Sequence, residues 1–233
     1  MFYNFSESMR IMKISIVSSG YVEIVTGIGF AEVGHNVIFV DVDENKVNLI
    51  NSAKPPIYEK GLEELMQKNK GKYYATMDYD EAITKSEITF ICVGTPSKED
   101  GSIDLSYVES VSKGIGEVLA NKDDFHVVVV KSTVIPGTTE GVVKPIIEKE
   151  SSKRAFKDFG LAMNPEFLRE GNAVEDFFNP DRIVIDAKDE KTKSILDELY
   201  KQFNCPKLFY GHKDGRNDKV CFKRFPHHQD FFC

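Results

Sequence analysis

Short apolar segments alternate with longer amphipathic segments along most of the chain. The short segments are rich in β-branched and aromatic residues, a pattern that predicts strands. They cover Lys13–Val17, 36–41, Tyr73–Thr76, 88–93, Val127–Val130, Gly160–Met163 and 181–185. The amphipathic segments predict a turn and helix at 18–34, then helices at 43–51, Leu62–Lys68, 79–86, 104–119, 139–149, 172–178 and 190–203. Strands that alternate with helices, without an internal repeat, indicate an α/β fold with a doubly wound, Rossmann-like parallel sheet.

The first strand, turn, helix and strand, between residues 13 and 41, have the arrangement of a dinucleotide-binding βαβ unit. In such a unit the helix N-terminus offers N–H groups and a positive dipole end to a pyrophosphate. An acid at the tip of the next strand accepts hydrogen bonds from the ribose hydroxyls. Asp41 stands about twenty residues after Gly20, where that acid is expected.

The glycine fingerprint of this unit is incomplete. The expected G-x-G-x-x-G reads SSGYVE from Ser18 to Glu23, so only the middle glycine, Gly20, is present. Ser18 is tolerable if the backbone of the turn keeps a negative φ. A Glu23 carboxylate would face the phosphates, and a like charge about 5 Å away at an effective dielectric of about 20 costs roughly 3 kcal/mol, or about a hundredfold in affinity. The sequence therefore predicts an intact fold with weak cofactor binding.

Composition and charge narrow the possible functions. The chain has 233 residues, 41% of them hydrophobic, which suffices for a single domain with a buried core. Its formal net charge of −7 argues against nucleic acid as a partner. No apolar run approaches the length of a membrane span, and the N-terminus lacks a secretory pattern. The four cysteines follow no disulfide framework, so we expect a cytoplasmic protein with no membrane partner.

Polar loops follow three of the predicted strands, at the edge where open α/β sheets bind ligands. Thr95 lies in the first of these loops, and residues 131–138 form the second. The third, at 164–173, is the most unusual, because Glu166 and Glu170 are four residues apart with a cation and two apolar side chains between them. From spacing alone, a capping turn before the next helix is the alternative interpretation.

Together these motifs resemble the UDP-glucose 6-dehydrogenases of the wider UDP-glucose/GDP-mannose dehydrogenase family. The matching segments, in the family's order between residues 12 and 208, are GYV, DVDENKV, PPIYE, ICVGTP, KSTVIPGT and NPEFLREGNAVEDFFNPDRIVI. The last segment is the most specific, and its Pro180-Asp181-Arg182 favours UDP-glucose as the substrate. A related UDP-sugar or GDP-mannose dehydrogenase is the alternative.

The resemblance implies an enzyme that oxidises UDP-glucose to UDP-glucuronate by two hydride transfers to NAD, through a thiohemiacetal and a thioester on a cysteine. It implies a cofactor site formed by Gly20, Tyr21, Val22, Asp41, Lys46, Thr95, Thr133 and Glu170. It implies that the sugar lies on Glu166, Phe167, Leu168, Arg169 and Glu170. Thr133 and Glu166 would be the catalytic residues, placing the water and protons for acid–base work. No metal is implied.

Parts of the family's site do not occur in this sequence. The nucleophilic cysteine, in an FGGxCxPKD-like segment, and the lysine and asparagine of a KYxxN helix come later in the family. Cys92 ends a predicted buried strand, where a core role is expected, and Cys205 lies in a connection. The family is oligomeric, but this chain lacks its central dimer helix. We therefore expect the chain to be inactive alone, and an inert fragment or a residual nucleotide-binding module is the alternative function.

Two terminal segments fall outside the predicted NAD-binding domain at 12–208. Residues 1–11 are expected to be a disordered extension, with Met12 as the natural start. Residues 209–233 lack periodicity and any family match, and we interpret them as a disordered, out-of-frame tail produced by a frameshift near Leu208. The alternative is a metal site in this tail, formed by Cys221, His227, His228 and Cys233, although their spacing fits no standard zinc pattern.

Overall fold

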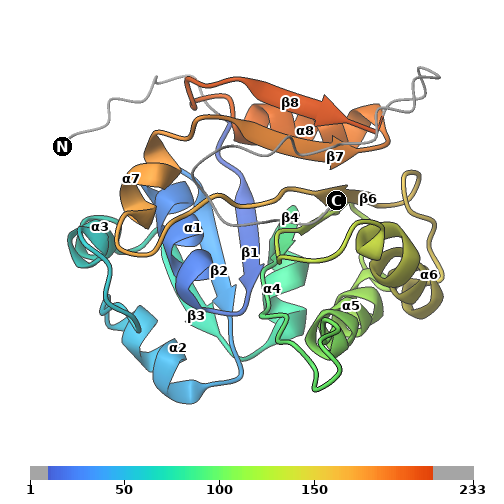
Figure 1. Cartoon of the computed structure of the whole chain (residues 1–233), viewed down its shortest axis with the longest axis horizontal. Coiled ribbons are helices and arrows are strands. Elements are labelled where there is room, and N and C mark those ends of the chain that lie inside the picture. The colour runs from blue at the N-terminus through green and yellow to red at the C-terminus, as the bar shows by residue number, and fades with distance from the viewer. Residues whose placement is uncertain (1–9, 212–233) are drawn as a thin grey trace.

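The computed structural model describes residues 10–211, which fold around one sheet (Figure 1). Within these residues the sheet has eight strands in the order β3-β2-β1-β4-β5-β6-β7-β8. The strands are β1 (Lys13–Val17), β2 (Asn36–Val40), β3 (Tyr73–Thr76), β4 (Ile88–Ile91), β5 (Val127–Val130), β6 (Gly160–Met163), β7 (Ile183–Ala187) and β8 (Lys207–Tyr210). The order reverses between β1 and β4, which makes their carboxyl ends the expected binding crevice.

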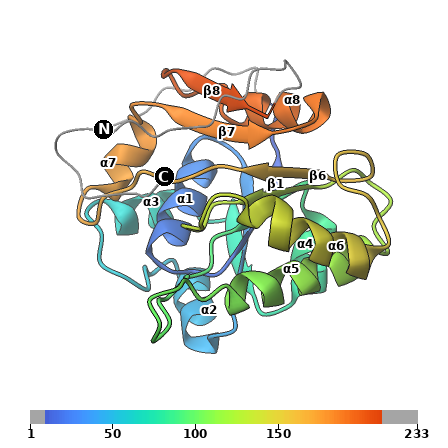
Figure 2. The ribbon, with the colours of Figure 1, turned by 45° about the vertical axis from the view of Figure 1, so that its right-hand side comes forward.

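Helices cover both faces of the sheet, and each face has its own apolar core (Figures 1 and 2). One face carries α1 (Tyr21–Glu32), α2 (Glu44–Asn51), α3 (Leu62–Lys68), α7 (Ala173–Phe178) and α8 (Glu190–Leu199). The other carries α4 (Tyr79–Lys85), α5 (Ser106–Leu119), the π-helical turn η1 (Thr139–Val143) and α6 (Lys144–Ser151). The strands between them read as apolar runs because both of their faces are buried.

The predicted doubly wound α/β fold is confirmed, with one departure from a fully parallel sheet. The first six strands run parallel to one another, but β7 pairs antiparallel with β6, and β8 follows the direction of β7. The connection between β6 and β7 explains this reversal. Its short helix α7 packs on α1, where the Phe177 and Phe30 ring centroids are 5.4 Å apart, instead of returning along the sheet.

Several element boundaries differ from the predicted ones. The sequence predicts Asp104 as the cap of the long helix, whereas α5 begins at Ser106, whose backbone N–H donates to Asp104 Oδ1 over 2.9 Å. The helix predicted at 139–149 begins as the π-helical turn η1. Strand β8 ends at Tyr210, two residues beyond the predicted domain boundary at 208. The predicted N-terminal extension, apart from its last two residues, and residues 212–233 lie outside the described part of the chain.

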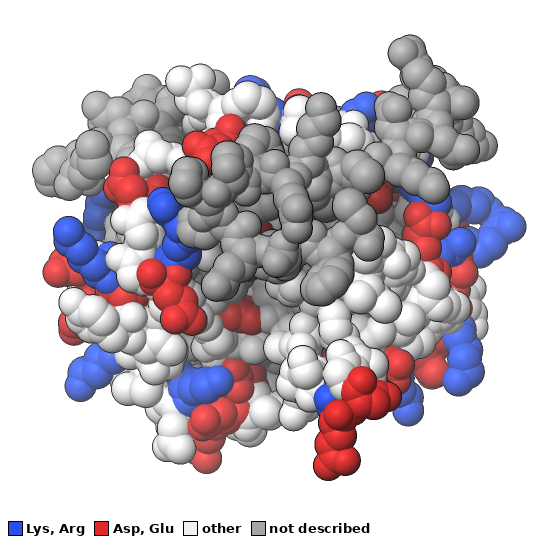
Figure 3. Space-filling model, in the orientation of Figure 1, with Lys and Arg blue, Asp and Glu red and all other residues white. Residues whose placement is uncertain are grey.

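Charges of both signs are distributed over the surface. On the face shown in Figure 3, basic and acidic side chains alternate around the rim and do not gather into one basic patch. Between residues 10 and 211, no helix combines the length and the apolar character that a membrane crossing requires.

Candidate functional site

The turn between β1 and α1 lies at the carboxyl end of β1, beside the point where the strand order reverses. Ser18 has a φ of 86° there, so the condition under which a serine would be tolerated, a negative φ, is not met. This left-handed region costs a residue with a Cβ about 1–2 kcal/mol, and it is the conformation for which the complete fingerprint uses glycine. A hydrogen bond of 2.8 Å from Ser18 N to Val40 O fixes the strained turn to β2.

We therefore expect Ser18→Gly to raise the free energy of unfolding by about 1 kcal/mol, because glycine removes the backbone strain. Denaturant unfolding followed by circular dichroism measures the change. Ser52→Gly is the matched control, since Ser52 has a φ of −84°. That variant should lose about 0.5–1 kcal/mol through the greater freedom of the unfolded chain. A destabilised Ser18→Gly protein would contradict the argument.

Asp41 lies at the tip of β2 with its carboxylate turned toward this turn. Its Oδ2 accepts hydrogen bonds from Ser19 N at 2.8 Å and Ser19 Oγ at 2.5 Å, and its Oδ1 accepts one from Asp43 N at 2.9 Å. The Lys46 ammonium, from α2, is 3.7 Å from Oδ2. Burial alone would raise the pKa of Asp41, but these donors hold it below its usual value. The carboxylate is thus a fixed hydrogen-bond acceptor beside the turn.

Glu23, in the first turn of α1, is only 7% exposed. Burial raises its pKa to about 7, and the carboxylates of Asp41 and Glu166 add to this rise, whereas its own backbone N–H and Lys46 oppose it. A group with this pKa is about half protonated at neutral pH. The repulsion of phosphates that the sequence predicts therefore applies fully only at higher pH.

A buried polar cluster, which the sequence does not predict, lies near the turn at the carboxyl ends of β5 and β6. Asn164 Oδ1 accepts hydrogen bonds from Lys131 Nζ at 3.2 Å and from Tyr200 Oη at 2.6 Å, while its Nδ2 donates to Val184 O at 2.7 Å. Burial lowers the pKa of Lys131 and raises that of the nearby Cys92 thiol well above its usual value. The predicted core role of Cys92 is confirmed, since it is 4% exposed and protonated at neutral pH.

The loops after β4 and β5 lie against each other. Thr95 Oγ1 donates to Thr133 O over 2.7 Å, and Ser132 Oγ donates to Val93 O over the same distance. These bonds place Thr95 beside the backbone of Thr133, as expected for two loops on neighbouring parallel strands. The Thr133 side chain is exposed.

The loop at 164–173 holds the predicted sugar residues, and its side chains point in different directions. Glu166 Oε2 accepts a 2.6 Å hydrogen bond from Leu168 N. The Phe167 ring lies 5.0 Å from the Arg182 guanidinium carbon. Arg169 forms a two-pronged contact with Asp176, in which Nε and the terminal nitrogen lie 3.0 and 2.6 Å from the carboxylate oxygens. Of the two predicted acids, Glu166 is half-buried and Glu170 is exposed.

Glu59 joins this loop to the first turn of α1. It is 4% exposed and accepts hydrogen bonds from the Tyr21 hydroxyl, from Gly171 N at 2.9 Å and from Ala173 N at 3.1 Å. Gly171 N also donates to the Tyr21 oxygen over 2.7 Å. No role is predicted for Glu59 from the sequence, although an acid that follows two prolines in a loop is a usable signal.

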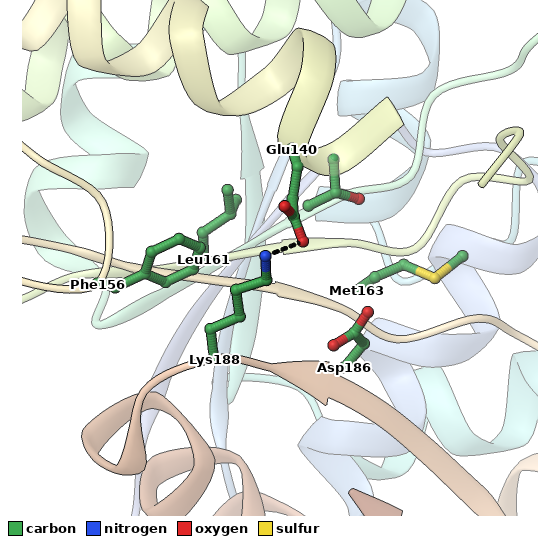
Figure 4. A pocket seen from close by; sticks show the side chains of 7 residues that line it. Glu140, Phe156, Leu161, Met163, Asp186 and Lys188 are labelled. Atoms are coloured by element: carbon green, nitrogen blue, oxygen red, sulfur yellow. Dashed lines mark ion pairs between the residues drawn. The ribbon is translucent and has the colours of Figure 1, made fainter. Parts of the chain in front are cut away.

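A small, shallow hollow lies elsewhere, between η1 and the β6–β7 junction (Figure 4). Its lining includes Phe156, Met163, Asp186 and the ion pair of Lys188 with Glu140, whose N–O distance is 2.5 Å. None of the predicted site residues lines it. In the described part of the chain, no group of three or more His, Cys, Asp or Glu side chains could hold a metal ion. The tail metal site considered above lies outside that part.

Comparison with known proteins identifies the family. Residues 12–204 match the family described as "UDP-glucose/GDP-mannose dehydrogenase family, NAD binding domain". The chain belongs to this family. The GDP-mannose 6-dehydrogenase of Pseudomonas syringae pv. tomato is 47% identical over 84% of this chain and 45% of that protein. The UDP-glucose 6-dehydrogenase AglM of Haloferax volcanii is also 47% identical, over 81% of this chain and 44% of that protein.

A solved structure of a relative gives the same result. A ternary complex of the GDP-mannose dehydrogenase from Pseudomonas aeruginosa superimposes with a TM-score of 0.84 at 45% identity, covering 85% of this chain and 46% of that one. The chain therefore spans less than half the length of these dehydrogenases and corresponds to their NAD-binding domain. The two curated relatives named above are equally similar to this chain at 47% identity, and further GDP-mannose 6-dehydrogenases match it at 42–47% identity.

The residues at the adenosine end of the predicted NAD site fit the cofactor, whereas those at the pyrophosphate end leave too little space for it. At the adenosine end, the fixed carboxylate of Asp41 is suited to ribose hydroxyls. At the pyrophosphate end, Glu23 Oε2 lies 2.7 Å from the position that a Cβ on Gly20 would occupy. The space beside the middle glycine, where the backbone must approach phosphates closely, is thus partly filled by a carboxyl group.

Proposed function

We propose that this chain is the NAD-binding half of a nucleotide-sugar 6-dehydrogenase that oxidises UDP-glucose to UDP-glucuronate, with GDP-mannose as the alternative substrate. One observation carries the proposal: the loop at 164–173 is docked onto the dinucleotide turn through Tyr21 and Glu59. The residues assigned to the sugar and to the cofactor thus belong to one structural unit, as transfer of hydride between the two ligands requires.

In this proposal NAD accepts hydride, and the residues of the chain hold and orient it. Asp41 accepts hydrogen bonds from the ribose hydroxyls, and Lys46 lies beside them. The first turn of α1, with Gly20, Tyr21 and Val22, faces the pyrophosphate. Further cofactor contacts come from Thr95, Thr133 and Glu170.

The acid–base work is assigned to Thr133 and Glu166, and the sugar contacts to Glu166, Phe167, Leu168, Arg169 and Glu170. Support for Glu166 comes from its position, because it lies close enough to Glu23, Cys92 and Lys131 to influence their pKa values. A half-buried carboxylate beside other titratable groups has the position that general acid–base catalysis requires. The choice of UDP-glucose follows the Pro180-Asp181-Arg182 segment.

Titration calorimetry with NAD tests this function. At about pH 6 the full chain should bind NAD, and NADP should bind at least about tenfold more weakly, because a 2′-phosphate would meet the Asp41 carboxylate. Asp41→Ala should abolish this preference, whereas the surface control Asp80→Asn should retain it. Absence of NAD binding would favour the alternative, an inert fragment.

The chain alone should not oxidise UDP-glucose or GDP-mannose. The thiol-bearing segment of the family does not occur in this sequence, and without a thiolate the covalent intermediate cannot form. NADH absorbance in the presence of either nucleotide sugar should therefore equal a protein-free blank. Production of NADH above that blank would refute this part of the proposal.

A further inference from the structure

The carboxyl group of Glu23 occupies the anion-binding end of α1. The first hydrogen bond within this helix runs from Ile24 N to Gly20 O over 3.2 Å, so the preceding N–H groups point out of its N-terminus. Gly20 provides no side chain to cap them. The Glu23 side chain folds back over Gly20 and accepts a hydrogen bond from its own backbone N–H. It therefore fills the position in which a helix N-terminus attracts phosphate.

Charged and titratable groups face Glu23 from five other parts of the chain. Asp41 at the end of β2 and Glu166 after β6 disfavour a negative charge on Glu23, whereas Lys46 on α2 favours one. Glu23 also interacts with Cys92 after β4 and with Lys131 after β5. Glu23 has two acids and two cations around it, whose effects on its pKa oppose each other. Burial is the largest effect and raises the pKa of Glu23 to about 7.

We propose that Glu23 is a proton-binding residue of the cofactor site, and that NAD binds together with one proton that the Glu23 carboxylate takes up. This inference rests on the proposed function, because it requires that NAD binds in the turn between β1 and α1. A pyrophosphate carries two negative charges, and its approach makes the ionised carboxylate less favourable than the neutral acid. The neutral acid can remain beside the phosphates and donate a hydrogen bond to them.

Proton uptake makes NAD affinity dependent on pH. Below the pKa of about 7 the acid is already neutral, so NAD binds without a proton. Above it, each added pH unit weakens binding by up to about tenfold. The dissociation constant should therefore increase about tenfold between pH 6 and pH 8. A site that repels NAD through a permanent charge would be weak at both pH values.

Titration calorimetry of the full chain with NAD, in buffers of different ionisation enthalpy, counts the protons taken up. We expect about one proton per NAD at pH 8 and close to none at pH 6. Glu23→Gln keeps the shape of the side chain without the titrating acid, so it should bind NAD without proton uptake and with nearly equal affinity at both pH values. The exposed Glu44, in the first turn of α2, gives the matched control Glu44→Gln, which should behave like the unmodified chain.

The possible outcomes separate this inference from the proposed function. NAD binding without proton uptake at pH 8 would overturn the inference and leave the proposed function intact. Uptake that persists in Glu23→Gln but disappears in Glu166→Gln would assign the proton to Glu166 and also overturn it. No NAD binding by the unmodified chain or by Glu23→Gln at either pH would overturn both. Because the proton count of the unmodified chain needs no variant, a misfolded variant cannot obscure the result.

Discussion

Replacing Asn164 by leucine should lower the free energy of unfolding by about 3–5 kcal/mol. Asn164 is 2% exposed, and its amide forms hydrogen bonds with Lys131, Tyr200 and the backbone of Val184. Leucine has a similar volume but can make none of these hydrogen bonds. The Lys131 ammonium, 8% exposed, would lose its hydrogen-bonded partner, and a buried charge without a partner is among the costliest single defects in a folded protein.

Urea or guanidinium unfolding at neutral pH measures the loss. The matched control is Asn121→Leu, because Asn121 is an exposed residue in the turn after α5, and this change should cost less than about 0.5 kcal/mol. Adding Lys131→Met to Asn164→Leu should recover part of the lost unfolding free energy, since it removes the buried ammonium that no longer has its hydrogen-bond acceptor. A loss below about 1 kcal/mol in Asn164→Leu would show that the amide does not stabilise the carboxyl ends of β5 and β6.

Replacing Glu23 by glutamine should raise the free energy of unfolding at neutral pH by about 3 kcal/mol and leave it nearly unchanged near pH 4.5. The folded protein holds the proton of Glu23 up to a pKa of about 7, whereas the unfolded chain releases it at the ordinary value of 4.5. The contribution of the neutral acid is therefore complete below pH 4.5 and is lost as the pH rises to 7. Glutamine has no proton to lose, so its advantage grows over this window.

The difference in unfolding free energy between the unmodified chain and Glu23→Gln separates the contribution of Glu23 from that of two buried histidines. Burial lowers the pKa of His35 to about 4 and that of His126 to about 3. Their contributions are present above the ordinary value of 6.5 and are lost as the pH falls, which is the opposite sign. Both histidines are present in both proteins and cancel in the comparison. Thermal or denaturant unfolding at several pH values, with Glu44→Gln as control, measures this difference in unfolding free energy. A difference that does not change with pH would refute the raised pKa of Glu23.

The sequence was sufficient for the elements whose signals are local. The strands Tyr73–Thr76, Val127–Val130 and Gly160–Met163 and the helix Leu62–Lys68 were predicted with their observed bounds, because each is a periodic or apolar run between clear breakers. The spacing within the βαβ unit also predicted the position of Asp41 at the tip of the second strand. The direction of β7 was not accessible in the same way, because it depends on how α7 packs against α1 and not on the composition of the strand.

The polar groups of the site were harder to predict because their partners are distant in the sequence. Lys131 and Asn164 lie 33 residues apart, and Tyr200 lies another 36 residues beyond Asn164. Nothing local indicates that an asparagine before a proline will be shared by three elements. The sequence predicts that a Glu23 carboxylate repels the phosphates of the cofactor. The raised pKa of Glu23, however, follows from burial, which only the folded arrangement reveals. The backbone strain at Ser18 likewise required the turn itself.

The contacts of Glu59 have a consequence for the order in which the molecule folds. The hydrogen bonds that fix the loop at 164–173 join residues 112, 114 and 150 positions apart in the chain. Closing a long loop costs chain entropy before its contacts repay it, so such contacts are expected to form after local structure. The helix α1 and the segment around Glu59 must therefore already be in place before Gly171 and Ala173 can dock. We therefore expect the sheet to form first, and the loop beside the cofactor turn to be among the last parts of the molecule to acquire its structure and among the first to lose it.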